Sequence, residues 1–117
     1  MLIRIKNLRL RTIIGINEWE RKDLQDVVIN VEVEYDASRA IETDSMEDGM
    51  NYRDITKRII RKVESSHFNL LDSLANSILQ IVMEDERVTK AAVEVDKPHA
   101  LRFADSVSVC CRAERSP

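Results

Sequence analysis

Apolar and polar residues alternate over the first eleven positions, but the alternation changes phase once. Ile3 and Ile5 are apolar at odd positions, whereas Leu8 and Leu10 are apolar at even positions. Side chains of a strand point alternately to its two faces, so a change of phase by one residue is typical of a β-bulge. The pattern predicts a first strand that carries a bulge near Asn7.

A second strand is predicted by an unbroken alternation. Val27, Ile29, Val31, Val33 and Tyr35 share one face, and Asn30, Glu32, Glu34 and Asp36 share the other. The charged connection before it runs from Gly15 to Leu24. Two antiparallel strands can be joined by a turn of only two residues, so this connection exceeds what a hairpin needs and is a candidate for function.

Two helices are predicted in the middle of the chain, after a polar and acidic loop at 37–50. Asn51 has the character of an N-cap with Asp54 at the third helical position, and Asn69 has the same character with Asp72 at the third position. Apolar residues follow each cap at helical spacing. They are Ile55, Ile59 and Val63 in the first helix, and Leu71, Leu74, Ile78 and Ile81 or Val82 in the second.

Two further strands are predicted near the end of the chain, one around 91–96 and one around 106–113. The order strand, strand, helix, helix, strand, strand indicates an α+β fold with antiparallel pairs. Two helices can cover only one face of such a sheet, and long strand edges favour pairing with further copies. We therefore expect a barrel built from several sheets, with a charged lumen formed by Arg4, Arg9, Arg11, Glu32, Glu34, Glu94 and Arg112.

Composition narrows the class of protein further. The chain has 117 residues, of which 44% are hydrophobic and 33% charged, as expected for one globular domain at 1–117. A net charge of −3 argues against a nucleic-acid binder. We expect no membrane span and no signal peptide, because apolar runs are short and the N-terminal residues alternate with charges. Cys110 and Cys111 are adjacent, which predicts reduced thiols in a cytosolic protein.

Four residues could carry chemistry, although each has a structural explanation. Lys97 shares the buried face with Val93 and Val95, so it either ends the strand with its amine turned to solvent or acts as a general acid and base. Tyr52 is a core residue or a proton donor. Glu20 belongs to a solvated charge run or to a functional loop, and Asp72 favours a helix N-terminus in any case.

The ordered set of motifs decides between these alternatives. The segments Ile3–Arg11, Asn51–Arg53, Phe68–Leu71 and Asp96–Ser108 resemble the dihydroneopterin aldolase family over nearly the whole chain. Asp96–Ser108 resembles the branch of the family that epimerises dihydroneopterin triphosphate. The stretch Gly15–Glu20 is closer to bacterial aldolases.

The resemblance implies the tunnelling fold, in which a four-stranded antiparallel sheet carries two helices between its second and third strands. It also implies that four subunits close a sixteen-stranded barrel and that two rings stack into a homo-octamer, with active sites between subunits. No metal or organic cofactor is expected. The substrate is expected to be a dihydropterin, and the protein is expected in the cytoplasm.

The resemblance also assigns roles to single residues. It implies that Lys97 is the general acid and base, that Tyr52 is the active-site tyrosine and that Glu20 lies near the substrate side chain. Gln25 is expected to close the loop that carries Glu20. The candidate substrate-binding residues are Asp72, the backbone at Leu71, Tyr52, Glu20, Gln25, His99 and Arg102, with His99 and Arg102 as phosphate contacts.

One position departs from the family pattern. The family has a glutamate where Asp72 stands, and this carboxylate holds the hydrogens on N2 and N3 of the pterin through two parallel contacts. Aspartate keeps the charge but is one methylene shorter. The backbone must then lie closer to the pterin, or a water must bridge the gap.

Three functions follow from the resemblance. The first is inversion of C2′ in dihydroneopterin triphosphate, to the monapterin form, by retro-aldol cleavage and re-addition. The second is the aldolase of folate biosynthesis, which releases glycolaldehyde and 6-hydroxymethyl-7,8-dihydropterin. The third is a catalytically idle pterin-binding protein of the same fold.

Overall fold

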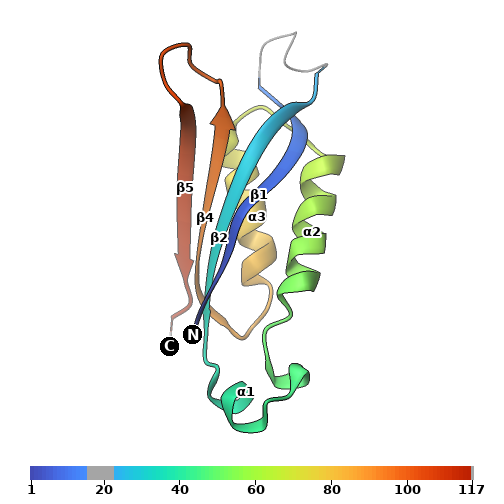
Figure 1. Ribbon diagram of the computed structural model, residues 1–117, viewed down its shortest axis with the longest axis vertical. Helices are drawn as coiled ribbons and strands as arrows, with labels where there is room; N and C mark the ends of the chain where they lie inside the picture. The colour runs from blue at the N-terminus through green and yellow to red at the C-terminus, as the bar shows by residue number, and fades with distance from the viewer. Residues whose placement is uncertain (16–22, 117) are drawn as a thin grey trace.

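Long strands and two packed helices run along the length of an elongated molecule of 52 × 24 × 23 Å (Figure 1). The computed structural model describes residues 1–15 and 23–116. The strands are β1 (Leu2–Ile14), β2 (Gln25–Tyr35), β3 (His67–Phe68), β4 (Val88–Pro98) and β5 (Ser106–Glu114). The helices are α1 (Ser38–Thr43), the 3-10 helix η1 (Met46–Asp48), α2 (Tyr52–Ser65) and α3 (Leu71–Met83).

The described strands form one sheet in the order β3-β1-β2-β4-β5, and the four long strands pair antiparallel as predicted. The short strand β3 was not predicted, because two residues are too few to show an alternation. It pairs parallel to the end of β1, with His67 opposite Ile13 and Phe68 opposite Ile14. Gly15, whose φ of 127° favours glycine, donates its N–H to the Phe68 carbonyl at 2.9 Å.

The predicted bulge in β1 is confirmed. The register with β2 shifts between Ile5 and Leu8, and Asn7 takes a left-handed φ of 53°. Asparagine tolerates this conformation better than most residues. The Asn7 N–H donates to the side-chain oxygen of Asn30 at 2.9 Å, which holds the bulge against β2.

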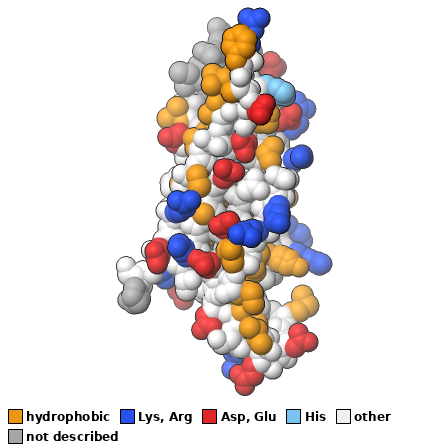
Figure 2. Space-filling view, turned by 60° about the vertical axis from the view of Figure 1, so that its left-hand side comes forward, with side chains coloured by type: hydrophobic (Ala, Val, Ile, Leu, Met, Phe, Trp, Pro, Cys, Tyr) orange, Lys and Arg blue, Asp and Glu red, His pale blue; other side chains and the backbone are white. Residues whose placement is uncertain are grey.

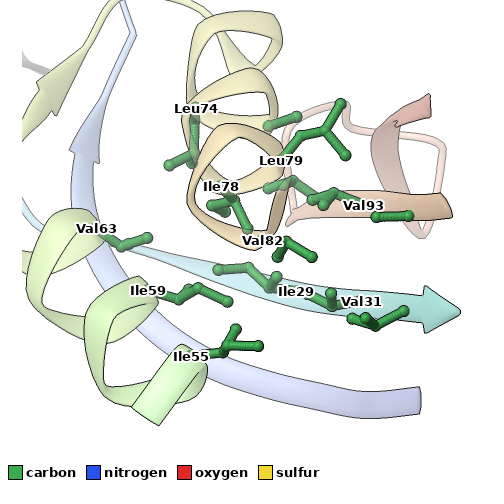
Figure 3. Packing of buried hydrophobic residues seen from close by; sticks show 14 of the residues in the cluster. Ile29, Val31, Ile55, Ile59, Val63, Leu74, Ile78, Leu79, Val82 and Val93 are labelled. Carbon is green, nitrogen blue, oxygen red and sulfur yellow. The ribbon is translucent and has the colours of Figure 1, made fainter. Parts of the chain in front are cut away.

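The core lies between the sheet and the two long helices, and Figure 3 shows its centre. The predicted apolar stripes of both helices point into it, together with the apolar faces of β2 and β4. The most completely buried side chains include Ile29, Val31, Ile59, Val63, Leu74, Ile78, Val82 and Val93. Burying such a side chain contributes about 1.5–3 kcal/mol, so this single layer accounts for how the helices are held.

The segment 37–50, predicted as a loop, instead contains α1 and η1. Both are short and bury no residue, so their sequences show no apolar periodicity that would predict a helix. Local polar contacts build them: the Asp36 carboxylate accepts from the Ser38 N–H at 2.9 Å, and Asp48 accepts from Thr43 and Arg39. Polar side chains that bond to nearby backbone are a usual way to start and end such turns.

One predicted N-cap is confirmed and the other is wrong. The Asn51 side chain accepts from the Asp54 N–H at 3.1 Å and caps α2. Helix α3, however, has Leu70 as its N-cap residue, no side chain caps it, and Asp72 is its second residue rather than its third. Asn69 ends the turn that follows β3, one residue too early to reach the first turn of α3.

The face of the sheet opposite the helices is polar, as predicted. Arg4 pairs with Glu32 at 3.2 Å, and Arg11 pairs with Asp26 at 3.3 Å. Figure 2, in which the β5 side of the molecule comes forward, shows acidic and basic side chains intermixed. Among the described helices, none is both long and apolar enough to cross a membrane.

Candidate functional site

The predicted site residues lie at two opposite ends of the molecule (Figure 1). We call one the Lys97 end, where β4 stops, α3 starts and β2 starts. We call the other the Tyr52 end, where α2 starts and α1 lies. The chain brings Lys97, Asp72, Leu71 and Gln25 together at the first end and leaves Tyr52 alone at the second.

Lys97 is the penultimate residue of β4 and lies opposite Val107 of β5. It continues the face of Val93 and Val95, which are fully buried under α3, and is itself half-buried. The lysine stem thus extends the buried row while the strand reaches the rim of the sheet. Lys97 therefore lies where the buried row of β4 meets the rim of the sheet.

Helix α3 starts toward the end of the sheet where Lys97 lies, because a short connection reverses the chain between α3 and β4 (Figure 1). Leu71 is half-buried and Asp72 is exposed at this helix start. The first N–H groups of a helix have no partner within the helix, and no side chain caps them here. The Lys97 end thus offers backbone donors and a carboxylate side by side, which the helix dipole favours.

Gln25 fixes the two ends of the connection between β1 and β2. Its Nε2 donates to the Ile14 carbonyl at 3.0 Å, and its backbone pairs with Thr12. The resemblance implied that Gln25 closes this connection, and the contact is consistent with that role. Glu20, and with it most of the candidate loop, lies outside the described residues.

His99 and Arg102 belong to the turn between β4 and β5. His99 is exposed, has a left-handed φ of 62° and lines a hollow of about 400 Å³ with Arg9, Arg11 and Asp26. The Arg102 guanidinium lies 5.4 Å from the centre of the Phe103 ring, an exposed contact. The structure thus brings His99 toward charged partners and pairs Arg102 with an aromatic ring.

Tyr52 is the first residue of α2 and is 47% exposed. It lines a mostly apolar hollow of about 510 Å³ whose other walls include Ile3, Tyr35 and Met50. Arg87 holds one wall, since its Nη1 donates to the Gly49 carbonyl at 2.7 Å. Sequence reasoning missed this hollow, because its walls combine β1 and β2 with η1 and the residues that flank it, and the sequence predicted the segment of η1 as a loop.

The two ends are too far apart to form one site within a single chain. Tyr35 shares the hollow with Tyr52 and pairs with Val88, the first residue of β4. A strand rises about 3.3 Å per residue, so Lys97 lies roughly 30 Å further along β4. A site that uses both Tyr52 and Lys97 therefore needs two copies of the chain.

The described carboxyl groups whose pKa is shifted, those of Asp36, Asp48 and Asp85, lie away from the Lys97 end. The Arg87 side chain, which hydrogen-bonds Asp85, lowers the pKa of the Asp85 carboxyl, with desolvation acting against it. Burial raises the pKa of the Cys111 thiol. Within residues 1–15 and 23–116, no group of three or more His, Cys, Asp or Glu side chains is placed to hold a metal ion.

The strand order and the paired helices define an α+β protein of the tunnelling fold, and comparison with known proteins gives its family. A sequence model described as dihydroneopterin aldolase matches residues 3–112. The chain belongs to this family. It is 53% identical to a dihydroneopterin triphosphate 2′-epimerase of Pseudomonas aeruginosa, over 97% of this chain and 92% of that protein.

Two further relatives place the chain within the family. A dihydroneopterin triphosphate 2′-epimerase of Escherichia coli K12 is 51% identical over 97% of this chain and 95% of its own length. The crystal structure of E. coli dihydroneopterin aldolase with neopterin superposes with a TM-score of 0.91 at 25% identity, covering 97% of this chain and 98% of that chain.

Proposed function

We propose that this protein is an enzyme that inverts C2′ of the side chain of dihydroneopterin triphosphate. The observation that carries the proposal is the identity to the two epimerases, 53% and 51%, against 25% to the aldolase of known structure. The shared fold supports pterin chemistry for both branches. The margin in identity favours the epimerase.

The chemistry needs an acid–base group and no external electron sink. The N5=C6 imine of the dihydropterin ring is conjugated to C1′, so it can accept an electron pair. When the proton leaves the 2′-hydroxyl, the C1′–C2′ bond breaks, C2′ becomes an aldehyde and the electron pair moves into the ring as an enamine. Rotation of the aldehyde and re-formation of the bond invert C2′ and give the monapterin form.

Lys97 is proposed to move this proton. A general acid–base group typically contributes about 10²–10⁴-fold to the rate. The support is its place at the rim of the sheet, half-buried at the end of the sheet where α3 starts. The Nζ atom of a lysine accepts a proton as the neutral amine and donates one as the ammonium, so the same group can serve both cleavage and re-addition.

The start of α3 is proposed to hold the pterin ring. The Asp72 carboxylate would accept the hydrogens on N2 and N3, and the backbone N–H groups from Leu71 onward would face the ring oxygen. Glu20 and Gln25 would close the site over the substrate side chain. In support, Gln25 already joins the ends of this connection through its contact with Ile14.

Tyr52 is proposed to come from a neighbouring copy, which makes the active site intersubunit. In support, Tyr52 shares its hollow with Tyr35, which pairs with Val88, and Val88 lies roughly 30 Å from Lys97 along β4. The open edges also support it: in the described chain, β5 has one partner strand, and β3 covers only the last two residues of β1. We infer a homo-octamer of two stacked rings, and a cytoplasmic location that agrees with the free thiols of Cys110 and Cys111.

The second candidate is the aldolase, favoured by the family model itself. Both activities share the cleavage step. If C1′ of the enamine is protonated, the fragments part and 6-hydroxymethyl-7,8-dihydropterin leaves. If the aldehyde returns to C1′, the product is the epimer.

Product analysis separates the candidates. The protein is incubated with dihydroneopterin and with its triphosphate, and the products are resolved by chiral chromatography. We expect the triphosphate to be epimerised with a higher kcat/KM than the free substrate. Release of 6-hydroxymethyl-7,8-dihydropterin as the main product from dihydroneopterin would favour the aldolase, and binding without turnover of either compound would favour the idle protein.

A further inference from the structure

A hydrogen bond at the Tyr52 end ties together two stretches that lie far apart in the sequence. Arg87 belongs to the short connection between α3 and β4, and its Nη1 donates to the Gly49 carbonyl at 2.7 Å. Gly49 follows η1, and it lines the same hollow of about 510 Å³ as Tyr52, three residues further on. Arg87 therefore reaches the backbone that leads into Tyr52, the first residue of α2.

The Asp85 carboxylate holds the guanidinium group of Arg87 in a fixed orientation. Its Oδ2 accepts from Nη2 at 3.0 Å, and its Oδ1 accepts from Nε at 3.2 Å and from the Arg87 backbone N–H at 2.9 Å. A planar guanidinium that is held by two such bonds has a set direction for its remaining donors. In this protein that direction leads from Nη1 to the Gly49 carbonyl.

The connection that carries Arg87 is itself fixed to the sheet. Val88, the next residue, is fully buried and pairs with Tyr35 of β2. Arg115, just past the end of β5, donates from Nε to the Val88 carbonyl at 3.1 Å and from Nη2 to the Met83 carbonyl at 2.6 Å. Arg87 thus extends from a rigid frame, and a functional group is held precisely when its supporting groups are themselves locked by packing and hydrogen bonds.

Few other contacts hold the segment 37–51, which leads into α2. Helices α1 and η1 bury no residue. Ala37 and Met50 pack into the core near the two ends of the segment. In the part of the chain that the structure describes, the other hydrogen bonds of this segment join residues within 36–55. The bond from Arg87 is thus the polar contact that fixes the backbone in front of α2 to the rest of the fold.

We propose that Arg87 is a positioning residue for Tyr52, whose place in the active site it fixes through Gly49. The inference rests on the proposed function, in which Tyr52 completes the site of a neighbouring copy, and it deepens that function. Arg87 touches no reacting atom. It acts on where the phenol of Tyr52 stands, and a misplacement of about 1 Å that originates far from the chemistry can cost about 10²-fold in rate.

A double-mutant cycle tests whether Arg87 acts through Tyr52. Arg87→Met removes every donor of the guanidinium group, and it should lower kcat/KM about tenfold because the phenol is displaced. Tyr52→Ala removes the side chain that is positioned. In the double variant, the loss should exceed that of Tyr52→Ala by less than about twofold, since no phenol remains to be displaced. A merely structural role of Arg87 would multiply the two losses.

Two further variants separate geometry from charge. Arg87→Lys keeps the positive charge, but a single ammonium cannot hold Asp85 and Gly49 as the fork of an arginine does, so kcat/KM should stay well below the wild-type value. Arg39→Met is the matched control. Arg39 pairs with Asp48 at 3.0 Å in the same segment, but its guanidinium contacts a side chain and not the backbone. Its replacement should leave kcat/KM within about twofold of wild type, as expected for an exposed ion pair.

A spectroscopic measurement reports the position of Tyr52 without turnover. The chain has two tyrosines, Tyr35 and Tyr52, so incorporation of 3-fluorotyrosine gives two fluorine resonances, and Tyr52→Phe assigns them. Arg87→Met should shift or broaden the Tyr52 resonance in the fluorine NMR spectrum. Arg39→Met should leave it unchanged, and thermal unfolding of each variant reports whether its fold is intact.

The outcomes separate this inference from the proposed function. If the protein epimerises the triphosphate and Arg87→Met changes neither kcat/KM nor the Tyr52 resonance, the inference is wrong and the function stands. A fully multiplicative loss in the double variant, or wild-type activity of Arg87→Lys, would also overturn the inference. If the wild type turns over neither substrate while Arg87→Met still moves the Tyr52 resonance, the proposed function is wrong and the coupling of Arg87 to Tyr52 stands.

Discussion

The side chain of Gln25 donates a hydrogen bond to the carbonyl of Ile14 at 3.0 Å and so joins the two ends of the connection between β1 and β2. Gln25 is half-buried and opens β2, while Ile14 is buried and closes β1. The contact fixes where the connection leaves and re-enters the sheet. It therefore sets the frame within which Glu20 is proposed to meet the substrate.

Gln25→Met should keep the length of the side chain and remove its donor. We expect the free energy of unfolding to fall by about 1 kcal/mol, the net value of one such hydrogen bond. If Glu20 in this connection meets the substrate, kcat/KM should fall by more than the loss of folded protein alone would explain. Urea unfolding and steady-state kinetics measure the two effects, and Gln80→Met on the exposed face of α3 is the control. Loss of stability with unchanged kcat/KM would separate Gln25 from the site.

Lys97→Ala should reduce turnover by about 10²–10⁴-fold, because it removes the proposed acid–base group. Neopterin binding should largely persist, since the proposed pterin contacts lie on α3. The matched control is Lys90→Ala, an exposed lysine near the start of the same strand. Turnover within about threefold of wild type would mean that Lys97 only ends its strand.

Asp72→Asn should weaken binding of neopterin by about 2–4 kcal/mol, because an amide NH₂ would face the ligand's donors and a charge-assisted pair would be lost. Asp72→Glu should keep or improve affinity. Asp54→Asn is the control, since Asp54 holds a comparable place in the first turn of α2. If Asp72 serves only the helix dipole, both asparagine variants will cost a few tenths of a kcal/mol in stability and leave binding unchanged.

An intersubunit site predicts that two inactive variants restore each other. Tyr52→Phe and Lys97→Ala damage opposite ends of the chain, so a mixed ring contains sites built from two intact ends. With random assembly of equal amounts, roughly a quarter of the sites carry no lesion. Co-refolded mixtures should therefore recover about that fraction of the wild-type rate.

Lys97→Ala mixed with Asp72→Asn provides the control for this experiment. Both residues lie at the same end, so every site in the mixture keeps one lesion wherever the subunits sit. No recovery is expected there. Recovery in neither mixture, with assembly confirmed by sedimentation, would argue that Tyr52 does not complete the Lys97 site.

Strand alternation and helical spacing were sufficient to predict the four long strands, both long helices and the bulge in β1. These features repeat over many residues and are fixed by burial. The elements that escaped prediction are local: β3 has two residues, and α1 and η1 are held by polar side chains such as Asp36 and Asp48. The wrong cap at Asn69 has a similar origin, because a cap depends on a single residue and α3 starts one residue later than the pattern predicted.

Less of the site than of the fold could be predicted from the sequence. Periodicity showed that Lys97 was out of place on a buried face, but nothing in it joined Lys97 to Asp72. That link came from the resemblance, and the structure brings the two residues to one end through the turn between α3 and β4. The hollow beside Tyr52 could not be foreseen, since its walls come from β1, β2 and η1, three separate stretches of chain.

The pKa of Asp85 gives a prediction for acid stability. Its hydrogen bond with Arg87 lowers the pKa of the folded state below the unfolded value, so the stabilisation is present above about pH 4 and is lost as the pH falls through the folded pKa. Asp85→Asn should therefore flatten the loss of stability between about pH 5 and pH 3, by a few tenths of a kcal/mol for so exposed a pair. Urea unfolding curves of the wild type and of Asp85→Asn across this pH range measure the difference. Identical dependence of stability on pH in the two proteins would contradict the prediction.

The bulge at Asn7 determines which face of the sheet each later side chain of β1 occupies. With one residue fewer, Leu8, Leu10 and Thr12 would turn outward, and Arg9 and Arg11 would turn under the helices. The same backbone would then expose apolar side chains at the hollow beside His99, and it would bury the guanidinium groups of Arg9 and Arg11. The extra residue at the bulge thus determines which of two sets of side chains faces the helices. Deleting one residue there would exchange the two faces of β1 from Leu8 onward.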